Sequence, residues 1–261
     1  MNREAWGDFA VSGWLGRPVT FLPEVDSTNL RLAELAARGA TEGTALIADC
    51  QTRGRGRLGR IWQSPPGRNL YVSFLLRPDL PPERAPQITL VAGVAVAELL
   101  TRYCPGVTTL KWPNDVLIGG RKVCGILTEM RTRGGRVDSI VVGIGVNLNM
   151  EKGEFHGDFR QTSTSLREET GRAVDRKAFA RSLFASLEAW CDRYRTEGFP
   201  PVRDRWLSLS RIVGKTISTG HGEETVRGRV LDMDASGALV FENEGGRVHT
   251  LHAGEITLED Y

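Results

Sequence analysis

Apolar positions in the first half of the chain alternate between strand-like runs and helical stripes. Residues 43–49 (GTALIAD) and 69–78 (NLYVSFLLRP) are compact apolar runs, typical of buried strands. Residues 26–39 carry apolar side chains at helical spacing between the cap-forming DSTN and a terminal glycine, which predicts a helix. A long apolar helix is predicted from about Gln87 to Cys104. A short strand, broken by Pro23, is expected before the first helix.

The second half begins with strands and then changes to helices. The stretch TTLKWPND is interrupted at Pro113, and the next apolar run turns back at Gly119–Gly120, which predicts a hairpin. VDSIVVGIGVNLN is a β-branched run with a glycine at every second position late on. Residues 175–198 form an amphipathic helical pattern capped by an aspartate, and residues 200–211 predict a shorter helix that begins with two prolines.

From about residue 212 the helical periods stop. Short apolar runs alternate with turn residues every eight to twelve positions, as in a small β-barrel. The sequence therefore predicts a catalytic or binding domain over residues 1–210 and a small β domain over residues 211–261.

Composition limits the classes of function. Lys and Arg number 34 against 32 Asp and Glu, a net charge of +2, whereas a dedicated nucleic-acid binder usually carries a broad basic surface. The four cysteines are far apart and the four histidines form no ligand cluster, so neither zinc nor a disulfide is expected. The N-terminus has no signal-peptide pattern, and the longest apolar stretch is too short to span a bilayer. A cytoplasmic location, with no membrane and no DNA as partners, is the expectation.

The positive charge is concentrated in one segment, the arginine loop (residues 49–63, DCQTRGRGRLGRIWQ). Four arginines and three glycines alternate within residues 53–60. Glycines let backbone N–H groups approach an anion, and guanidinium forks match phosphate oxygens, so this composition suits a polyphosphate ligand. It does not match the P-loop pattern. We expect a loop that is mobile when empty and folds over its ligand; a solvated charged loop is the alternative.

Two further clusters are less specific when each is taken alone. KWPNDVLIGGRKVCGILTE holds Lys111, Asn114, Asp115, Arg121 and Lys122 around a proline-fixed turn, an arrangement that can aim polar groups into a cleft or merely stabilise the turn. The stretch DSTN (residues 26–29) can be nothing more than a helix cap.

Together, EVDSTN, QTRGRGRLGRIWQSPPGRNLY, KWPNDVLIGGRKVCGIL.E and GIGVNLN occur in an order that resembles the biotin protein ligases. The resemblance implies an α+β fold of the class II aminoacyl-tRNA synthetase/biotin ligase type. Such a fold has a mixed β-sheet with helices on one face, followed by a small SH3-like β-barrel. It also implies that biotin and ATP react to biotinyl-5′-AMP, from which biotin passes to a lysine of the biotin carboxyl carrier protein of acetyl-CoA carboxylase or a related carboxylase.

The resemblance also implies roles for individual residues. Arg57, Lys122 and Asp115 would be catalytic, with Asp115 orienting the incoming lysine or taking its proton. Mg²⁺ would be held mainly by ATP, with no metal site of the protein's own. The residues expected at biotin are Ser27, Thr28, Asn29, Gln51, Arg55, Gly56, Arg57, Lys122 and Gly125. Those expected at ATP or the adenylate are Gly54, Arg55, Arg57, Arg60, Trp62, Lys111, Asn114, Lys122 and Asn147.

The chain departs from the family pattern in places, and alternative functions and assemblies stay open. Leu58 stands where some family members carry an arginine, and we expect it to pack on the folded loop. About 25 residues precede DSTN, too few for a helix-turn-helix module, so the ligase-only form is expected. A lipoate ligase or octanoyltransferase is the nearest rival enzyme. The apolar run SIVVGIGVNLN, if it is a sheet edge, could pair with a second copy in a ligand-promoted homodimer.

Overall fold

The computed structural model of the chain describes residues 6–7, 9–157, 159–220 and 225–259. Its α-helices are α1 (Thr28–Ala37), α2 (Ala85–Thr101), α3 (Phe159–Thr162), α4 (Leu166–Thr170), α5 (Arg176–Glu197) and α6 (Pro200–Ser210), with 3₁₀ turns η2 (Arg57–Gly59), η3 (Pro82–Arg84) and η4 (Lys152–Glu154). Its strands are β1 (Val19–Val25), β2 (Ala45–Gln51), β3 (Leu70–Leu76), β4 (Thr108–Lys111), β5 (Asp115–Ile118), β6 (Arg121–Arg133), β7 (Arg136–Val146), β8 (Thr216–Thr219), β9 (Val226–Met233), β10 (Leu239–Asn243), β11 (Val248–Leu251) and β12 (Thr257–Leu258).

Within the described ranges, seven strands form one mixed sheet in the order β1-β2-β3-β7-β6-β5-β4. β1 runs parallel to β2, and the remaining neighbours are antiparallel. Pro23 does not break its strand, contrary to expectation. β1 lies at the edge of the sheet and pairs with β2 through Leu22 and Glu24, so a residue without an N–H is tolerated between them.

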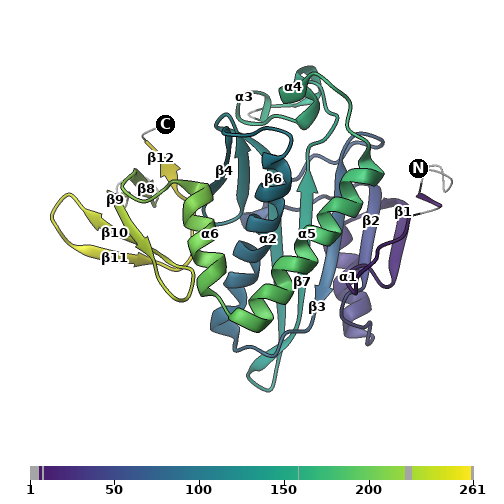
Figure 1. Cartoon of the computed structure of the whole chain (residues 1–261), viewed down its shortest axis with the longest axis horizontal. Helices are drawn as coiled ribbons and strands as arrows, with labels where there is room; N and C mark the ends of the chain where they lie inside the picture. Colours follow the sequence, from purple (N-terminus) through teal and green to yellow (C-terminus); the bar gives the residue numbers. More distant parts are fainter. Residues whose placement is uncertain (1–5, 8, 158, 221–224, 260–261) are drawn as a thin grey trace.

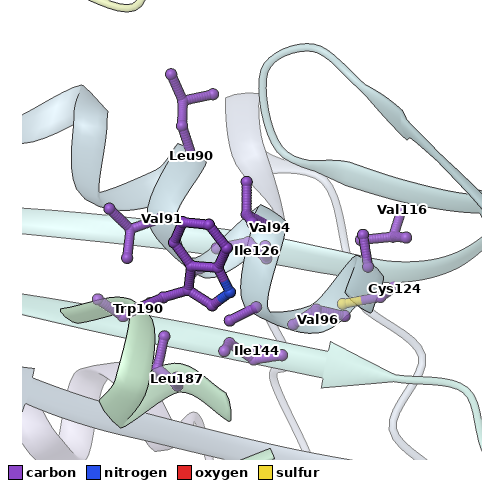
Figure 2. Packing of buried hydrophobic residues seen from close by; sticks show 14 of the residues in the cluster. Leu90, Val91, Val94, Val96, Val116, Cys124, Ile126, Ile144, Leu187 and Trp190 are labelled. Carbon is purple, nitrogen blue, oxygen red and sulfur yellow. The ribbon is translucent and has the colours of Figure 1, made fainter. Parts of the chain in front are cut away.

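One face of this sheet is covered by helices that bury the main core. α2 packs on β6, β4 and β7, while α5 and α6 pack against α2. Figure 2 shows Val91 and Val94 of α2 among Ile126 and Ile144 of the sheet and Leu187 of α5. Each such side chain contributes roughly 1.5–3 kcal/mol when it is fully buried. The almost uninterrupted apolar sequence of α2 follows from this position between two layers.

The other face carries α1, so the expectation that helices lie on one face is wrong. Leu32 and Ala36 of α1 form a separate apolar cluster with Leu75 of β3 and Val141 of β7. Their strand neighbours Phe74 and Val142 belong to the main core instead, because successive side chains of a strand point to opposite faces. α1 therefore forms a second, smaller helical layer on the opposite face of the sheet, packed on β3 and β7.

β7 lies inside the sheet, which corrects a third expectation. It pairs with β3 on one side and β6 on the other over most of its length. The run 139–149 therefore presents no free edge for a second copy, and its valines and isoleucines are explained by burial on both faces. The edges of the large sheet are β1 and β4.

The described residues after α6 form an antiparallel sheet of order β11-β10-β9-β8-β12, which fits the expected SH3-like domain. Figure 1 places this sheet beyond α6, at the end of the molecule away from the N-terminus. It is tied to the large domain by the indole of Trp112, which donates to the Gly237 carbonyl at 3.1 Å, and by the side-chain amide of Gln87, which donates to the Ala235 carbonyl at 2.8 Å. Across the described residues, no helix has the length and apolarity needed to cross a bilayer.

Candidate functional site

A row of residues in register crosses the α1 face of the sheet and forms the base of the site. Tyr71 of β3 is opposite Gly145 of β7, which is opposite Gly125 of β6, then Asp115 of β5 and Lys111 of β4. Because paired residues point to the same side, this row is a path from the α1 half of the sheet to its far edge.

A β-bulge brings Lys122 to the same face as Gly125. The pairing of β5 with β6 shifts register between Val116 and Leu117, and the carbon that a side chain at Gly125 would add lies only 3.2 Å from Lys122 Cε. Residues three apart on a regular strand point to opposite faces, whereas one extra residue restores the same side. The bulge therefore places the lysine next to Asp115 instead of in the core.

A cavity of about 470 Å³ opens above this row, between α1, the arginine loop and strands β5 to β7. It is lined by nearly all the side chains that the sequence singled out, which come from five separate segments. These are Ser27, Thr28, Asn29, Gln51, Arg55, Gly56, Arg57, Arg60, Trp62, Lys111, Asn114, Asp115, Lys122, Gly125 and Asn147.

Gly54 is the expected site residue that does not line the cavity. A side chain there would lie 2.4 Å from the Trp62 carbonyl and 2.6 Å from Ser64 Oγ, so the glycine lets the two arms of the arginine loop approach each other. The Trp62 N–H donates to the Gly54 carbonyl at 3.0 Å across this contact. Gly54 thus shapes the loop from behind and is no direct contact of the cavity.

Ser27, Thr28, Asn29 and Gln51 line the α1 end of the cavity with polar, uncharged side chains, and the first three are buried. Thr28 and Asn29 lie in the first turn of α1, yet their side chains turn to the sheet: Ser73 Oγ lies 2.8 Å from Thr28 Oγ and 2.6 Å from Asn29 Oδ1. The side-chain oxygen of Gln51 accepts from the Thr28 amide at 2.9 Å. Ser27 occupies the N-cap position without a side-chain capping bond. Ser27, Thr28 and Asn29 therefore line the cavity and do not cap the helix with their side chains.

Glycines on β6 and β7 let larger side chains approach the strands closely at the base of the cavity. A side chain at Gly145 would lie 2.5 Å from the Trp62 ring, one at Gly125 would lie 2.9 Å from the same ring, and one at Gly143 would lie 2.1 Å from Asn29 Oδ1. The Trp62 ring thus lies flat across the strands, with Lys122 Nζ 5.5 Å from its centre. The alternating glycines of GIGVN are explained by this close approach.

The other end of the cavity is cationic and reaches the C-terminal domain. Arg57 donates to Asn114 Oδ1 at 3.1 Å and to the Gly254 carbonyl at 2.9 Å, and Arg60 pairs with Glu255 at 2.6 Å. Burial lowers the pKa of Arg57, which the charges of Glu255 and Asp115 partly oppose. A half-buried guanidinium that is hydrogen-bonded to neutral oxygens, and not paired directly with a carboxylate, can receive an incoming phosphate.

Lys122 stands where the two ends meet. Its ammonium pairs with Asp115 Oδ1 at 2.6 Å, and both side chains are mostly shielded from solvent. The Asn114 side-chain amide donates to the Ile126 carbonyl at 2.8 Å, which fixes the turn that carries Asp115. Asn147 lies deeper, where its amide donates to the Thr164 carbonyl at 3.0 Å. A bound carboxylate at this junction would exchange one anionic partner of the lysine for another.

Leu58 corrects a fourth expectation, since it does not pack on the loop. Its side chain is 70% exposed and its backbone has a φ of 53°, a conformation that non-glycine residues seldom adopt. Ile61 beside the cavity is equally exposed. The tip of the arginine loop therefore presents two apolar side chains to solvent near the mouth of the cavity.

Several residues of the site were not identified from the sequence. The sequence pattern assigns no role to the glycines of β7, Gly143 and Gly145, or to Glu129. Ser73 sits in an ordinary strand pattern, and nothing local connects Gly254 or Glu255 to an arginine nearly 200 positions earlier. Long-range pairing alone brings these residues to the cavity.

Comparisons with known proteins agree with this geometry. Residues 21–147 match the model of the biotin/lipoate A/B protein ligase family. Over 240 residues, 90% of this chain, it is 36% identical to 98% of the biotin--[acetyl-CoA-carboxylase] ligase of Paracoccus denitrificans. It is 35% identical over 243 residues to the bifunctional ligase/repressor BirA of Escherichia coli K12, covering 93% of this chain and 74% of that protein.

A solved structure is similar along almost the whole length. The biotin protein ligase from Aquifex aeolicus in complex with biotin and ATP superposes with a TM-score of 0.78 at 33% identity, covering 93% of this chain and 99% of that one. Fold and cavity thus define a ligase that joins a small carboxylic acid to a protein. The chain belongs to the biotin/lipoate A/B protein ligase family, in its biotin protein ligase branch.

Proposed function

We propose that this cavity carries out both half-reactions of a biotin protein ligase. The enzyme activates biotin with ATP to biotinyl-5′-AMP and transfers the biotinyl group to a lysine of a biotin carboxyl carrier protein. The observation that carries the proposal is that one cavity joins a neutral polar end to a cationic end, with Lys122 between them. Such a division matches a ligand whose uncharged ring and reactive carboxylate lie at opposite ends.

In the proposed binding mode the ureido ring of biotin lies among Thr28, Asn29 and Gln51. These side chains are buried or half-buried and hydrogen-bonded to one another, so they are held in place before the ligand arrives. Ser27, Gly125 and the backbone of Arg55 and Gly56 complete this end, and Lys122 receives the carboxylate.

The nucleotide lies along the cationic end in the same proposal. Arg55, Arg57 and Arg60 face the phosphates, Lys111, Asn114 and Asn147 lie beside the nucleotide, and Trp62 covers it as the arginine loop closes. Fixed cations aimed at the α-phosphate stabilise the charge that develops when the carboxylate attacks. Holding the two anions side by side replaces a bimolecular encounter.

Mg²⁺ is proposed as the ion that accompanies ATP. No group of three or more His, Cys, Asp and Glu side chains that could hold a metal lies among the described residues. In this proposal the triphosphate itself carries the ion, which would supply further charge neutralisation when bound.

The second half-reaction brings the carrier lysine to the activated carbonyl carbon at Lys122. Asp115 is the nearest carboxylate and is proposed to orient this amine or to accept its proton. Cytoplasmic location belongs to the proposal as well, since the four cysteines are free thiols. The division into domains at residue 210 and a ligand-promoted dimer stay predictions.

The test is mass spectrometry of the small molecules formed from biotin and Mg-ATP without any acceptor protein, with lipoate in parallel. Biotinyl-AMP is expected from the unaltered chain and is expected to be lost in Arg57→Ala. Arg53→Ala is the matched control, because this exposed arginine of the same loop does not line the cavity. An adenylate of lipoate but not of biotin would contradict the proposal.

A further inference from the structure

Glu129 of β6 is not among the residues expected in the site, yet its carboxylate contacts two residues that were expected at biotin, Asn29 and Arg55. One oxygen accepts from the Asn29 side-chain amide at 2.8 Å, and the other pairs with Arg55 at 2.9 Å. The side chain is about a third exposed. It thus lies beside the cavity wall and contacts residues that line it.

Asn29 has its amide orientation fixed by acceptors. Its NH₂ group donates to Glu129 and to the Leu127 carbonyl at 3.0 Å, and neither an ionised carboxylate nor a carbonyl can donate in return. The amide oxygen of Asn29 must therefore be the atom that faces Ser73 Oγ at 2.6 Å. Both N–H bonds of Asn29 are used, and its oxygen keeps one lone pair.

This orientation orders the hydroxyl groups behind it. Three contacts join Asn29, Ser73, Thr28 and Gln51, but the two hydroxyls bring only two hydrogens, because neither amide oxygen can donate. With the single hydroxyl hydrogen of Ser73 in the shorter of its two contacts, Ser73 donates to Asn29, and the Thr28 hydroxyl donates to the Gln51 oxygen at 3.1 Å. The oxygens of Asn29 and Thr28 are then left as acceptors at the cavity.

We infer that Glu129 is a positioning residue that sets the hydrogen-bond polarity of the biotin end, so that this end accepts N–H groups. The inference rests on the proposed function, because the two ureido N–H groups of biotin are what an acceptor-lined site would recognise. A neutral amide in place of Glu129 brings a donor to Asn29. The Leu127 carbonyl alone then holds the orientation of the Asn29 amide, so the ordered set of acceptors is weakened.

The test is calorimetric titration of biotin into the unaltered chain, Glu129→Gln, Asn29→Ala and the double variant. Loss of one hydrogen bond that involves a charged group predicts about tenfold weaker biotin binding for Glu129→Gln. In the Asn29→Ala background the same change is expected to cost less than twofold, because its effect passes through Asn29. Glu34→Gln is the control, an exposed carboxylate of α1 that pairs with Arg31, and should bind as the unaltered chain does.

Biotin binding by Glu129→Gln within twofold of the unaltered chain would overturn the inference, as would an equal loss in both backgrounds. If Glu129→Gln fails to fold, Glu129→Asp and Glu129→Asn can be compared, because they are nearly equal in shape and differ in the charged acceptor. The Asp variant is expected to bind biotin more tightly than the Asn variant. Equal biotin binding by the two variants would overturn the inference. Absence of biotin binding by the unaltered chain would instead count against the proposed function itself.

Discussion

The ammonium of Lys122 lies 2.6 Å from a carboxylate oxygen of Asp115, on a face of β6 that the lysine reaches only through the bulge between β5 and β6. The pair couples the two half-reactions in our proposal. Lys122 would stabilise the charge of the first step, and Asp115 would act on the amine of the second.

Replacing Lys122 by glutamine is expected to slow biotinyl-AMP formation by about 100-fold or more, the effect of removing one fixed stabilising charge. The measurement is single-turnover formation of the adenylate. Arg121→Gln is the matched control, because that side chain carries the same charge one residue earlier and pairs with Glu169 at 2.6 Å. Equal losses in both variants would show that the charge of the segment matters and not its position.

Asp115→Asn is expected to slow transfer to the carrier lysine by about 100-fold, in the range of a lost general base. Preformed adenylate complex should be mixed with the carrier and, separately, with hydroxylamine, whose amine is already unprotonated at neutral pH. A base role predicts little loss with hydroxylamine. A similar loss with both nucleophiles would identify Asp115 as a residue that positions the adenylate.

Gly143→Ala is expected to weaken biotin binding strongly. The added carbon would lie 2.1 Å from Asn29 Oδ1, and a clash of this size costs roughly 1–3 kcal/mol or displaces the asparagine. Gly153→Ala is the control, since nothing lies within 4 Å of the added carbon there. Biotin titration and thermal unfolding of both variants separate a local loss of biotin binding from a general loss of stability. Unchanged biotin binding by Gly143→Ala would mean that Asn29 does not contact biotin.

A fragment ending at residue 210 is expected to unfold at a lower temperature than the whole chain. Ile217, Val230 and Phe241 belong to the same buried cluster as the core of the large domain, and the bond from Trp112 to Gly237 would be lost. Exposed apolar surface at this junction destabilises by about 25 cal/mol per Å². Thermal unfolding followed by circular dichroism gives the answer, and an unchanged transition would show that the two units are independent.

Asp49→Asn is expected to destabilise the protein at neutral pH by about 3 kcal/mol or more, because it leaves the charge of Arg176 buried without its partner. Asp49 pairs with Arg176 at 2.7 Å, with both side chains largely buried. Burial alone would raise the pKa of Asp49, but Arg176 and the Gly67 amide outweigh it and hold the pKa below its ordinary value of 3.8.

The pH dependence of this ion pair has a definite sign. A depressed pKa in the folded state contributes stability above the unfolded value, and that stability is lost as the pH falls through the folded one. Denaturant unfolding of the two proteins should therefore differ most near neutral pH, with the difference shrinking below about pH 4. A constant difference down to pH 2 would contradict a role for the Asp49 charge.

The sequence by itself predicted most of the longer helices and strands and the residue types that line the candidate site. Apolar spacing predicted the long helices α2 and α5, and the cap at Asp175 is confirmed by its bonds to the amides of Lys177 and Ala178. The spacing of turn residues predicted a C-terminal region of short strands, and β8 to β12 lie there. These features depend on neighbours a few positions away, which a linear pattern records. The ordered motifs likewise identified the family.

Only the tertiary structure decided how these parts meet. The bulge that turns Lys122 toward Asp115, the interior place of β7, and the contact of Arg57 with Gly254 all depend on pairing between distant segments. Strand register is set by which faces become buried in the whole fold, and no local period encodes a one-residue shift. For the same reason the sequence assigns no role to Glu129, whose contacts with Asn29 of α1 and Arg55 of the arginine loop depend on the tertiary structure.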